Sequence, residues 1–293
     1  MKYAYYPGCS LEKTQRGYDV SVREVFRALD LELIDIDDWN CCGATMYMSV
    51  QETVALAVSA RNLALAERMG MDIIAPCSSC FTVLAKTNRI LRSVPEMHRD
   101  VNEALAEGGL SYAGHTAVRH PLDILMNDLG MPAIKTKQKR RLEGLRIAPY
   151  YGCQIVRPEK GFDDRENPVL MDRLFDGLGG EVVPFPLKVR CCGGMLMTTF
   201  EETALRLNRD LLACAQRSGA DLIVTTCPLC HINLEGYQDR INQRYGTGFS
   251  MPILYFTQLL GIALGIAPEK LGLDASFIPL GRKISTMMEA AYV

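Results

Sequence analysis

Two adjacent cysteines followed by a glycine occur twice in this chain, and the rest of the sequence is arranged around them. The first motif is Cys41-Cys42-Gly43 and the second is Cys191-Cys192-Gly193. Each is preceded by a lone Gly-Cys and is followed, after 34 residues, by a Cys-x-x-Cys motif. The chain therefore carries two sets of five cysteines: Cys9, Cys41, Cys42, Cys77 and Cys80, then Cys153, Cys191, Cys192, Cys227 and Cys230.

The two sets align at a nearly constant offset, which predicts a duplicated unit. The offset is 144 for the first cysteine (153 minus 9) and 150 for the other four (for example, 192 minus 42). One length change before the double cysteine accounts for the difference. Two units, 1–143 and 144–293, each have the size of an ordinary domain. The eleventh cysteine, Cys214, falls outside the pattern and is expected to be a small buried hydrophobic residue.

Short apolar runs alternate with helical patterns in both units. Predicted strands cover 2–6, 31–36, 71–75 and 117–119, then 145–150, 181–185, 221–225 and 253–256. Predicted helices cover 14–29, 50–70, a segment from 80, 98–107 and 121–129, then 168–178, 201–218, 232–245 and 257–264. This alternation predicts an α/β fold of two pseudo-symmetric repeats, each a small, mainly parallel sheet flanked by helices. The cysteine motifs follow strands, so the five thiols of each unit are expected to meet at the carboxyl edge of its sheet as a metal site.

Composition narrows the possible functions. A hydrophobic fraction of 48% and a charged fraction of 23% are typical of a globular protein. The net charge of -2 predicts no nucleic-acid partner, and the basic run 135–141 is interpreted as a solvated linker at the unit boundary. We expect neither a secretory signal nor a transmembrane segment, because the longest apolar stretch, 251–268, is broken by proline and glycine. Eleven cysteines without an export signal predict a cytoplasmic protein with metal or redox chemistry.

Several kinds of chemistry could use five thiols. A structural zinc site is complete with four ligands, adjacent cysteines suit disulfides poorly, and a thioredoxin-like pair leaves the double cysteine unexplained. Iron-sulfur ligation by thiolates fits best. The chain has no closely spaced ferredoxin-type cysteine run and no Gly-x-Gly-x-x-Gly motif, so electrons are expected to come from another protein.

The ten-cysteine pattern resembles the CCG-domain proteins, specifically the B subunit of heterodisulfide reductase and its bacterial homologues, over nearly the whole chain. The resemblance implies that each set of five cysteines holds a non-cubane [4Fe-4S] cluster. It also implies an oxidoreductase that reduces or forms a disulfide between the two clusters. The implied partners are a ferredoxin-like C subunit, a flavin-containing A subunit, and a disulfide or thiol substrate.

The resemblance leaves the substrate open between the methanogen coenzyme M–coenzyme B heterodisulfide and a bacterial sulfur intermediate or lipoate-type thiol. Two other classes of function also stay open at this stage. One is a non-catalytic electron-transfer subunit, and the other is a binding module stabilised by zinc.

Three residues near the second set are candidates for catalysis. Lys188 and Arg190 lead into the double cysteine and could bind an anionic substrate, although a solvated strand end is an equally good interpretation. His231 follows Cys230 and could deliver a proton to a departing thiolate, but such a histidine more often caps or packs. His120 carries the same ambiguity.

Overall fold

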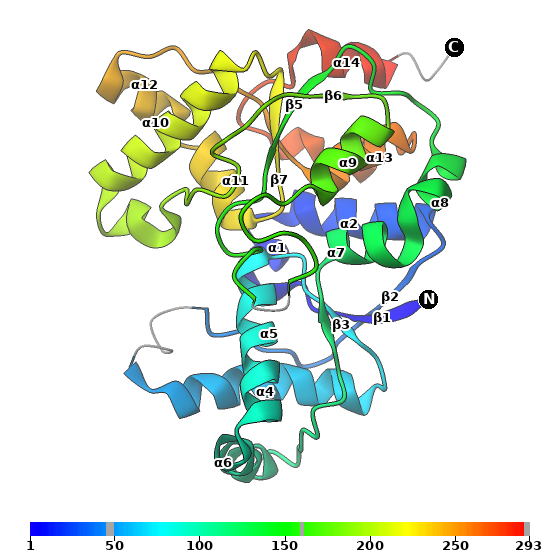
Figure 1. The fold of residues 1–293 in the computed structure, drawn as a ribbon, viewed down its shortest axis with the longest axis vertical. Coiled ribbons are helices and arrows are strands. Elements are labelled where there is room, and N and C mark those ends of the chain that lie inside the picture. The colour runs from blue at the N-terminus through cyan, green and yellow to red at the C-terminus, as the bar shows by residue number, and fades with distance from the viewer. Residues whose placement is uncertain (45–49, 159–160, 290–293) are drawn as a thin grey trace.

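Two four-stranded parallel sheets form the frame of the molecule (Figure 1). The structure is a computed structural model, and it describes residues 1–44, 50–158 and 161–289. The first sheet has the order β2-β1-β3-β4, with β1 Lys2–Tyr5, β2 Glu32–Asp35, β3 Ile73–Ile74 and β4 Val118–Arg119. The second has the order β6-β5-β7-β8, with β5 Arg146–Tyr150, β6 Glu181–Val182, β7 Leu222–Thr225 and β8 Ile253–Tyr255. All pairs are parallel and the two orders are equivalent, so the predicted fold class and repeat are confirmed.

Burial explains why these segments become central strands. All four residues of β7 are buried, as are the last three of β1, because helices cover both faces of a parallel sheet. The register pairs Tyr5 with Asp35 and Ile74, and Tyr150 with Thr225. The central strands of each sheet thus end side by side, just before the cysteine motifs.

The helices of the first unit follow the predicted pattern with local differences. They are α1 Gly8–Glu12, α2 Arg16–Ala28, α4 Glu52–Arg68, α5 Ser78–Ser93, α6 Pro95–Ala106, α7 Pro121–Asp123, a π-helical turn Ile124–Leu129, and α8 Gly130–Lys137. The expected linker at 135–141 is partly wrong, because α8 continues to Lys137. Lys135 and Lys137 lie in its last turn, where positive charge stabilises a helix.

The second unit contains α9 Leu170–Gly177, a 3-10 turn Gly194–Thr198, α10 Glu201–Arg217, α11 Pro228–Glu235, α12 Gln238–Tyr245, α13 Phe256–Ala263 and α14 Gly281–Glu289. The predicted helix 232–245 is wrong, since it is divided into α11 and α12. Gly236 is a weak helix former. Gln238 begins α12 and bonds the backbone of Met251, on the segment before β8, through both its amide nitrogen and its oxygen. These two bonds fix the start of α12 against the sheet.

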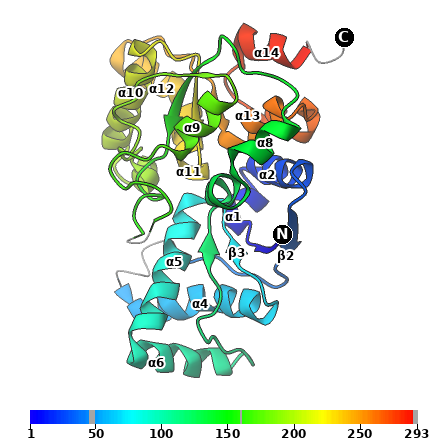
Figure 2. The ribbon, with the colours of Figure 1, turned by 45° about the vertical axis from the view of Figure 1, so that its right-hand side comes forward.

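The two units share a buried interface between α2 and α13, which lie side by side in both ribbon views (Figures 1 and 2). Ser21 Oγ lies 2.7 Å from Thr257 Oγ1, and the ring of Tyr18 stacks on Tyr255 with centroids 4.1 Å apart. Tyr18 also donates to the carbonyls of Pro76 and Thr226, which precede the two Cys-x-x-Cys motifs. The carboxyl edges of the two sheets therefore meet.

Within the described residues, no helix combines the length and apolar character needed to cross a membrane.

Candidate metal centre

The first set of cysteines gathers at the carboxyl edge of the first sheet. Cys9 lies in α1 after β1, Cys41 and Cys42 lie in the loop after β2, and Cys77 caps α5, whose first turn contains Cys80. Cys42 Sγ is 3.3 Å from Cys80 Sγ. Cys41 interacts with both Cys42 and Cys9, and Cys77 interacts with Cys80. The five thiols thus form one connected group.

The second set repeats this arrangement at the second sheet. Cys192 Sγ is 3.4 Å from Cys230 Sγ, the counterpart of the Cys42–Cys80 contact. Cys191 interacts with Cys153 and Cys192, while Cys227 interacts with Cys230. The thiols of each unit therefore lie close together, as the sequence predicted.

The sequence did not predict which cysteines of the two sets lie nearest to each other. Cys77 and Cys227, the caps of α5 and α11, lie close together across the unit interface. Ser78 Oγ donates to the carbonyl of Thr226 at 3.0 Å, and Tyr18 donates to the carbonyls of both Pro76 and Thr226. The outer residues Cys9 and Cys41 are exposed. The two groups of five thiols therefore lie next to each other, while the eleventh cysteine, Cys214, is buried on α10 as expected.

A glycine at the start of each set makes room for the thiols. Gly8 and Gly152 have φ values of +72° and +69°, a region that glycine occupies without strain. A Cβ on Gly8 would lie 3.1 Å from Cys80 Sγ, and one on Gly152 would lie 3.1 Å from Cys230 Sγ. Both the backbone conformation and the space beside the sulfur require glycine.

A buried tyrosine fixes the backbone before each double cysteine. Tyr6 donates its hydroxyl to the carbonyl of Asn40 at 2.8 Å, and Tyr150 donates to the carbonyl of Arg190 at 2.7 Å. Burial, and then the neighbouring thiols, raise the pKa of both phenols, so both remain protonated donors. The repeated Tyr before each Gly-Cys is visible in the sequence, but only the structure shows its role.

In each set, neighbouring groups lower the pKa of some thiols and raise the pKa of others. Hydrogen bonds from Cys153 and Cys192 hold the pKa of Cys191 well below its ordinary value, and the amide of Gly193 and the charge of Arg157 act in the same direction. The pKa of Cys227 is likewise lowered by hydrogen bonds from neighbouring thiols and then by backbone N–H groups of α11. Thiolates are the form in which cysteine binds metals.

Two residues near the second set were missed by sequence reasoning. Asn233 on α11 is 2% exposed, and its Nδ2 lies 3.6 Å from Cys192 Sγ and 2.9 Å from the carbonyl oxygen of Gly194. Arg157 is exposed, and its charge acts on Cys153 and Cys191. Neither belongs to a motif; the only sequence signal is that Asn233 lies one helical turn after Cys230.

The three predicted catalytic side chains have other contacts. Lys188 Nζ lies 3.3 Å from Asp172, and Arg190 lies 3.5 Å from Asp210 on α10. His231 is buried, its Nε2 bonds the carbonyl of Ile253, and burial lowers its pKa to about 4. Their proposed roles in catalysis stay predictions. His120 caps α7, which agrees with the simpler of its two interpretations.

The donor set fits an iron-sulfur cluster. Each unit brings together five thiols, the ligand type that such clusters require, around a glycine that leaves the sulfurs room. Within residues 1–44, 50–158 and 161–289, no three His, Cys, Asp or Glu side chains are arranged as a site for a single metal ion.

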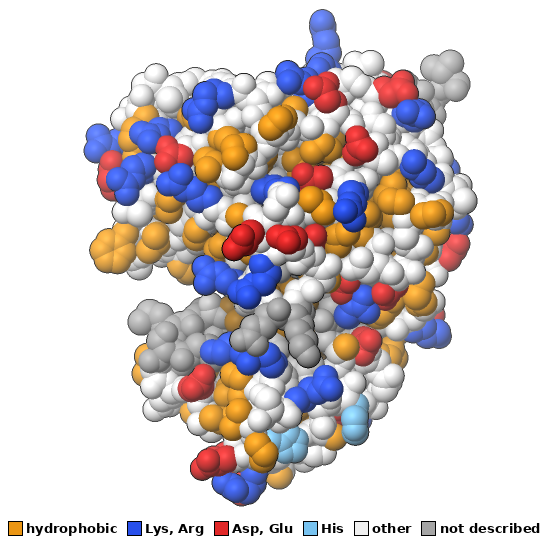
Figure 3. All heavy atoms as spheres, viewed as in Figure 1, with side chains coloured by type: hydrophobic (Ala, Val, Ile, Leu, Met, Phe, Trp, Pro, Cys, Tyr) orange, Lys and Arg blue, Asp and Glu red, His pale blue; other side chains and the backbone are white. Residues whose placement is uncertain are grey.

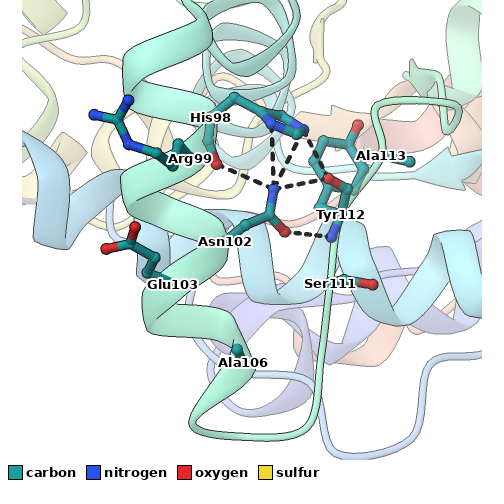
Figure 4. A pocket seen from close by; sticks show the side chains of 8 residues that line it. All are labelled: His98, Arg99, Asn102, Glu103, Ala106, Ser111, Tyr112 and Ala113. Atoms are coloured by element: carbon teal, nitrogen blue, oxygen red, sulfur yellow. Dashed lines mark hydrogen bonds between the residues drawn. The ribbon is translucent and has the colours of Figure 1, made fainter.

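The surface offers two further features. Figure 3 shows several Lys and Arg side chains near the middle of that face. An open pocket of about 600 Å³ lies elsewhere, beside α6, and none of the ten cysteines lines it. There the side chain of Asn102 bonds both the N–H and the carbonyl of Tyr112 and approaches His98 Nε2 at 3.2 Å (Figure 4). These bonds attach the segment after α6 to that helix, so they have a structural role.

A model of the CCG cysteine-rich domain matches residues 3–85 and 147–235 of the chain, one match in each unit. The chain is 33% identical over 282 residues, 94% of each chain, to the B subunit of the ferredoxin/F(420)H(2)-dependent CoB-CoM heterodisulfide reductase of Methanosarcina acetivorans. It is 34% identical to an Archaeoglobus profundus protein described as similar to the B subunit of heterodisulfide reductase, covering 92% of this chain and 93% of the relative.

Two other comparisons found a relative of a different kind and a solved structure with the same fold. The chain is 34% identical to the 8-methylmenaquinol:fumarate reductase membrane anchor subunit of Wolinella succinogenes, covering 94% of this chain and 97% of the relative. A hypothetical protein from Helicobacter pylori shares the fold, with a TM-score of 0.78 at 18% identity over 94% of this chain. The chain spans about half of that protein, 51%.

Proposed function

This chain belongs to the CCG cysteine-rich family that includes the B subunits of heterodisulfide reductases, and from this we propose that it is the catalytic iron-sulfur subunit of a heterodisulfide reductase-like complex. The proposed reaction adds two electrons and two protons to a disulfide to give two thiols, or runs in reverse. We propose that Cys9, Cys41, Cys42, Cys77 and Cys80 hold one non-cubane [4Fe-4S] cluster and that Cys153, Cys191, Cys192, Cys227 and Cys230 hold the other.

The observation that carries this proposal is the closeness of the two sets at Cys77 and Cys227, whose neighbours Pro76, Ser78 and Thr226 are joined by hydrogen bonds from Tyr18 and Ser78. Two clusters bound here would supply the two single electrons that one disulfide needs. The protein supports this by holding both sets at the shared edge of the two sheets, with Tyr6 and Tyr150 fixing the loops that carry the double cysteines.

The same reasoning extends to partners and compartment. We propose that a ferredoxin-like C subunit and a flavin-containing A subunit deliver the electrons, which agrees with the ferredoxin in the name of the M. acetivorans relative. All eleven cysteines are free thiols, which suits the reducing cytoplasm.

The test is an anaerobic preparation assayed for iron, acid-labile sulfide and zinc, then for reduction of a disulfide by an artificial one-electron donor. CoB-CoM heterodisulfide, which appears in the relative's name, is the first substrate, and a lipoate-type disulfide is the second. We expect iron and sulfide without zinc, and an electron paramagnetic resonance signal that changes when the product thiols are added. Zinc without sulfide would contradict the proposal and indicate a zinc-stabilised binding module.

A second candidate function follows from the Wolinella relative. At 34% identity, its name describes a membrane anchor subunit of a quinol:fumarate reductase, which favours an electron-transfer role without disulfide chemistry. In that case the clusters would be present, but their spectrum would not respond to thiols and no disulfide would be reduced. The same preparation separates the two functions.

A further inference from the structure

The two sites have the same cysteines but different surroundings. We propose that the C-terminal site has the more positive reduction potential of the two, and that Asn233 is the residue chiefly responsible. This inference rests on the proposed presence of two iron-sulfur clusters. It assigns an order to the sites: an electron shared between them resides mainly at Cys153, Cys191, Cys192, Cys227 and Cys230.

Asn233 gives the C-terminal site a buried hydrogen-bond donor. Its Nδ2 lies 3.6 Å from Cys192 Sγ, an ordinary separation for an N–H group and the large sulfur atom. The side chain is held in place because the same nitrogen is 2.9 Å from the carbonyl oxygen of Gly194. With only 2% of its surface exposed, Asn233 cannot exchange this position for water.

The N-terminal site has no such side chain at the matching position. The offset of 150 that aligns the double cysteines also aligns the first residues of α5 and α11, since 228 minus 78 is 150. Position 233 therefore corresponds to position 83, which is Val83, a residue without any donor. The duplicated helix carries an amide at this position in one unit and an apolar side chain in the other.

Within the described residues, one backbone donor beside each double cysteine is the same in both sites. The amides of Gly43 and Gly193 bond Cys41 and Cys191, respectively. Arg157 adds a second difference, since its positive charge acts on Cys153 and Cys191. Asn233 and Arg157 therefore both add positive potential to the C-terminal site.

The direction of the effect follows from charge. Reduction adds one negative charge to a cluster and its thiolate ligands. An N–H donor or a cation beside these sulfurs stabilises the reduced form more than the oxidised form, so the potential rises. The amide of Asn233 acts in a buried setting where a dipole is weakly screened.

Solvent acts in the opposite direction. Cys9 and Cys41 are exposed, whereas Cys153 and Cys191 are half-buried, and water near a cluster also stabilises its reduced form. Water must reorient around the added charge, while Asn233 already points at the sulfur. The fixed donor is therefore the larger effect in this proposal.

The test is a redox titration of the anaerobic, cluster-loaded protein followed by electron paramagnetic resonance. We expect two midpoints in the wild type. Asn233→Val, which copies position 83, should shift the higher midpoint to more negative potential and leave the lower one in place. The reciprocal Val83→Asn should shift only the lower midpoint, to more positive potential. The midpoint that moves identifies the site.

Asn208 supplies a matched control. It is fully buried and its Nδ2 bonds the carbonyl of Cys192 at 2.8 Å, but it has no contact with a cysteine sulfur among the described residues. Asn208→Val therefore disturbs the same loop without removing an N–H···S bond. We expect its midpoints to match those of the wild type.

Three outcomes would overturn the inference while leaving the proposed function intact: a single midpoint for both sites, a shift of the lower midpoint in Asn233→Val, or equal shifts in Asn233→Val and Asn208→Val. If Asn233→Val loses iron from the C-terminal site, the test rests on Val83→Asn. In that case, a lower midpoint that does not move in Val83→Asn contradicts the proposal. A protein without iron and sulfide would instead refute the proposed function itself.

Discussion

At the scale of single residues, the candidate centre depends on groups that are not ligands. Gly152 and Gly8 leave space beside a cysteine sulfur, and Tyr150 and Tyr6 hold the loop that carries each double cysteine. The same two roles are filled at equivalent positions in both units. The glycine and the tyrosine are therefore features of the repeated unit, and each role can be tested by substitution.

Replacing Gly152 with alanine should lower the iron content of the protein. The φ of +69° costs about 1–2 kcal/mol for any residue with a Cβ. The new methyl group would also lie 3.1 Å from Cys230 Sγ and displace it. We expect reduced stability and loss of iron from the C-terminal site, measured by thermal unfolding and by iron analysis.

Gly246→Ala is the control for this substitution. Gly246 has a φ of +64°, but no atom lies within 4 Å of an added Cβ. It should reduce stability by a similar amount, about 1 kcal/mol, and retain all its iron. Equal iron loss in both variants would show that the space beside Cys230 is unimportant.

Tyr150→Phe should destabilise the protein by about 1–2 kcal/mol, because the carbonyl of Arg190 loses its hydrogen bond from the fully buried Tyr150. Chemical denaturation measures the change. Tyr245→Phe is the control, since its hydroxyl bonds Glu202 at the surface and should contribute less than about 0.5 kcal/mol. If the two variants lose equal stability, Tyr150 has no special role in fixing the loop.

At the scale of elements, α11 carries a buried acid beside a buried base. Glu235 is 2% exposed, and its Oε2 lies 3.7 Å from His231 Nδ1; neither atom has a hydrogen-bond partner within the described residues. Burial raises the pKa of Glu235 to about 7 and lowers that of His231 to about 4. Both side chains are therefore uncharged over part of the acidic range.

Because the pKa of Glu235 is raised, we predict that Glu235→Gln is more stable than the wild type, by an amount that depends on pH. The unfolded carboxyl ionises near its ordinary pKa of 4.5, whereas the folded one ionises near 7, so wild-type stability falls as pH rises through this window. The variant should equal the wild type at pH about 4.5 and exceed it by about 3 kcal/mol above pH about 7.5. Comparing the two proteins cancels the opposite contribution of His231. Urea denaturation at both pH values measures the difference, and a difference independent of pH would contradict the assignment.

The elements also show what a single sequence can predict. The strands were predictable because buried parallel strands such as β7 read as short apolar runs. The division between α11 and α12 was not, since it depends on hydrogen bonds from Gln238 to Met251, thirteen residues away. The extension of α8 to Lys137 was missed because its polar residues lie on an exposed helix end.

At the scale of the whole molecule, the ten cysteines and their two groups followed from spacing alone. The closeness of Cys77 to Cys227 did not, because it depends on the packing of α2 against α13 across the unit boundary. The role of Asn233 could not be predicted either, because the sequence does not show that its side chain reaches the sulfur of Cys192. Repetition predicts what the two units share, and the structure is needed to show how they differ.

The most direct test of the account is the iron and acid-labile sulfide content of Cys192→Ser beside that of Cys214→Ser, both prepared without oxygen. Cys192 belongs to the second set, whereas Cys214 is buried on α10 outside both. Two [4Fe-4S] clusters require about eight iron atoms per chain in the wild type. We predict that Cys192→Ser loses about half of this iron and sulfide and that Cys214→Ser loses none. Full retention by Cys192→Ser, or equal loss from both variants, would contradict the assignment of the two five-cysteine sites.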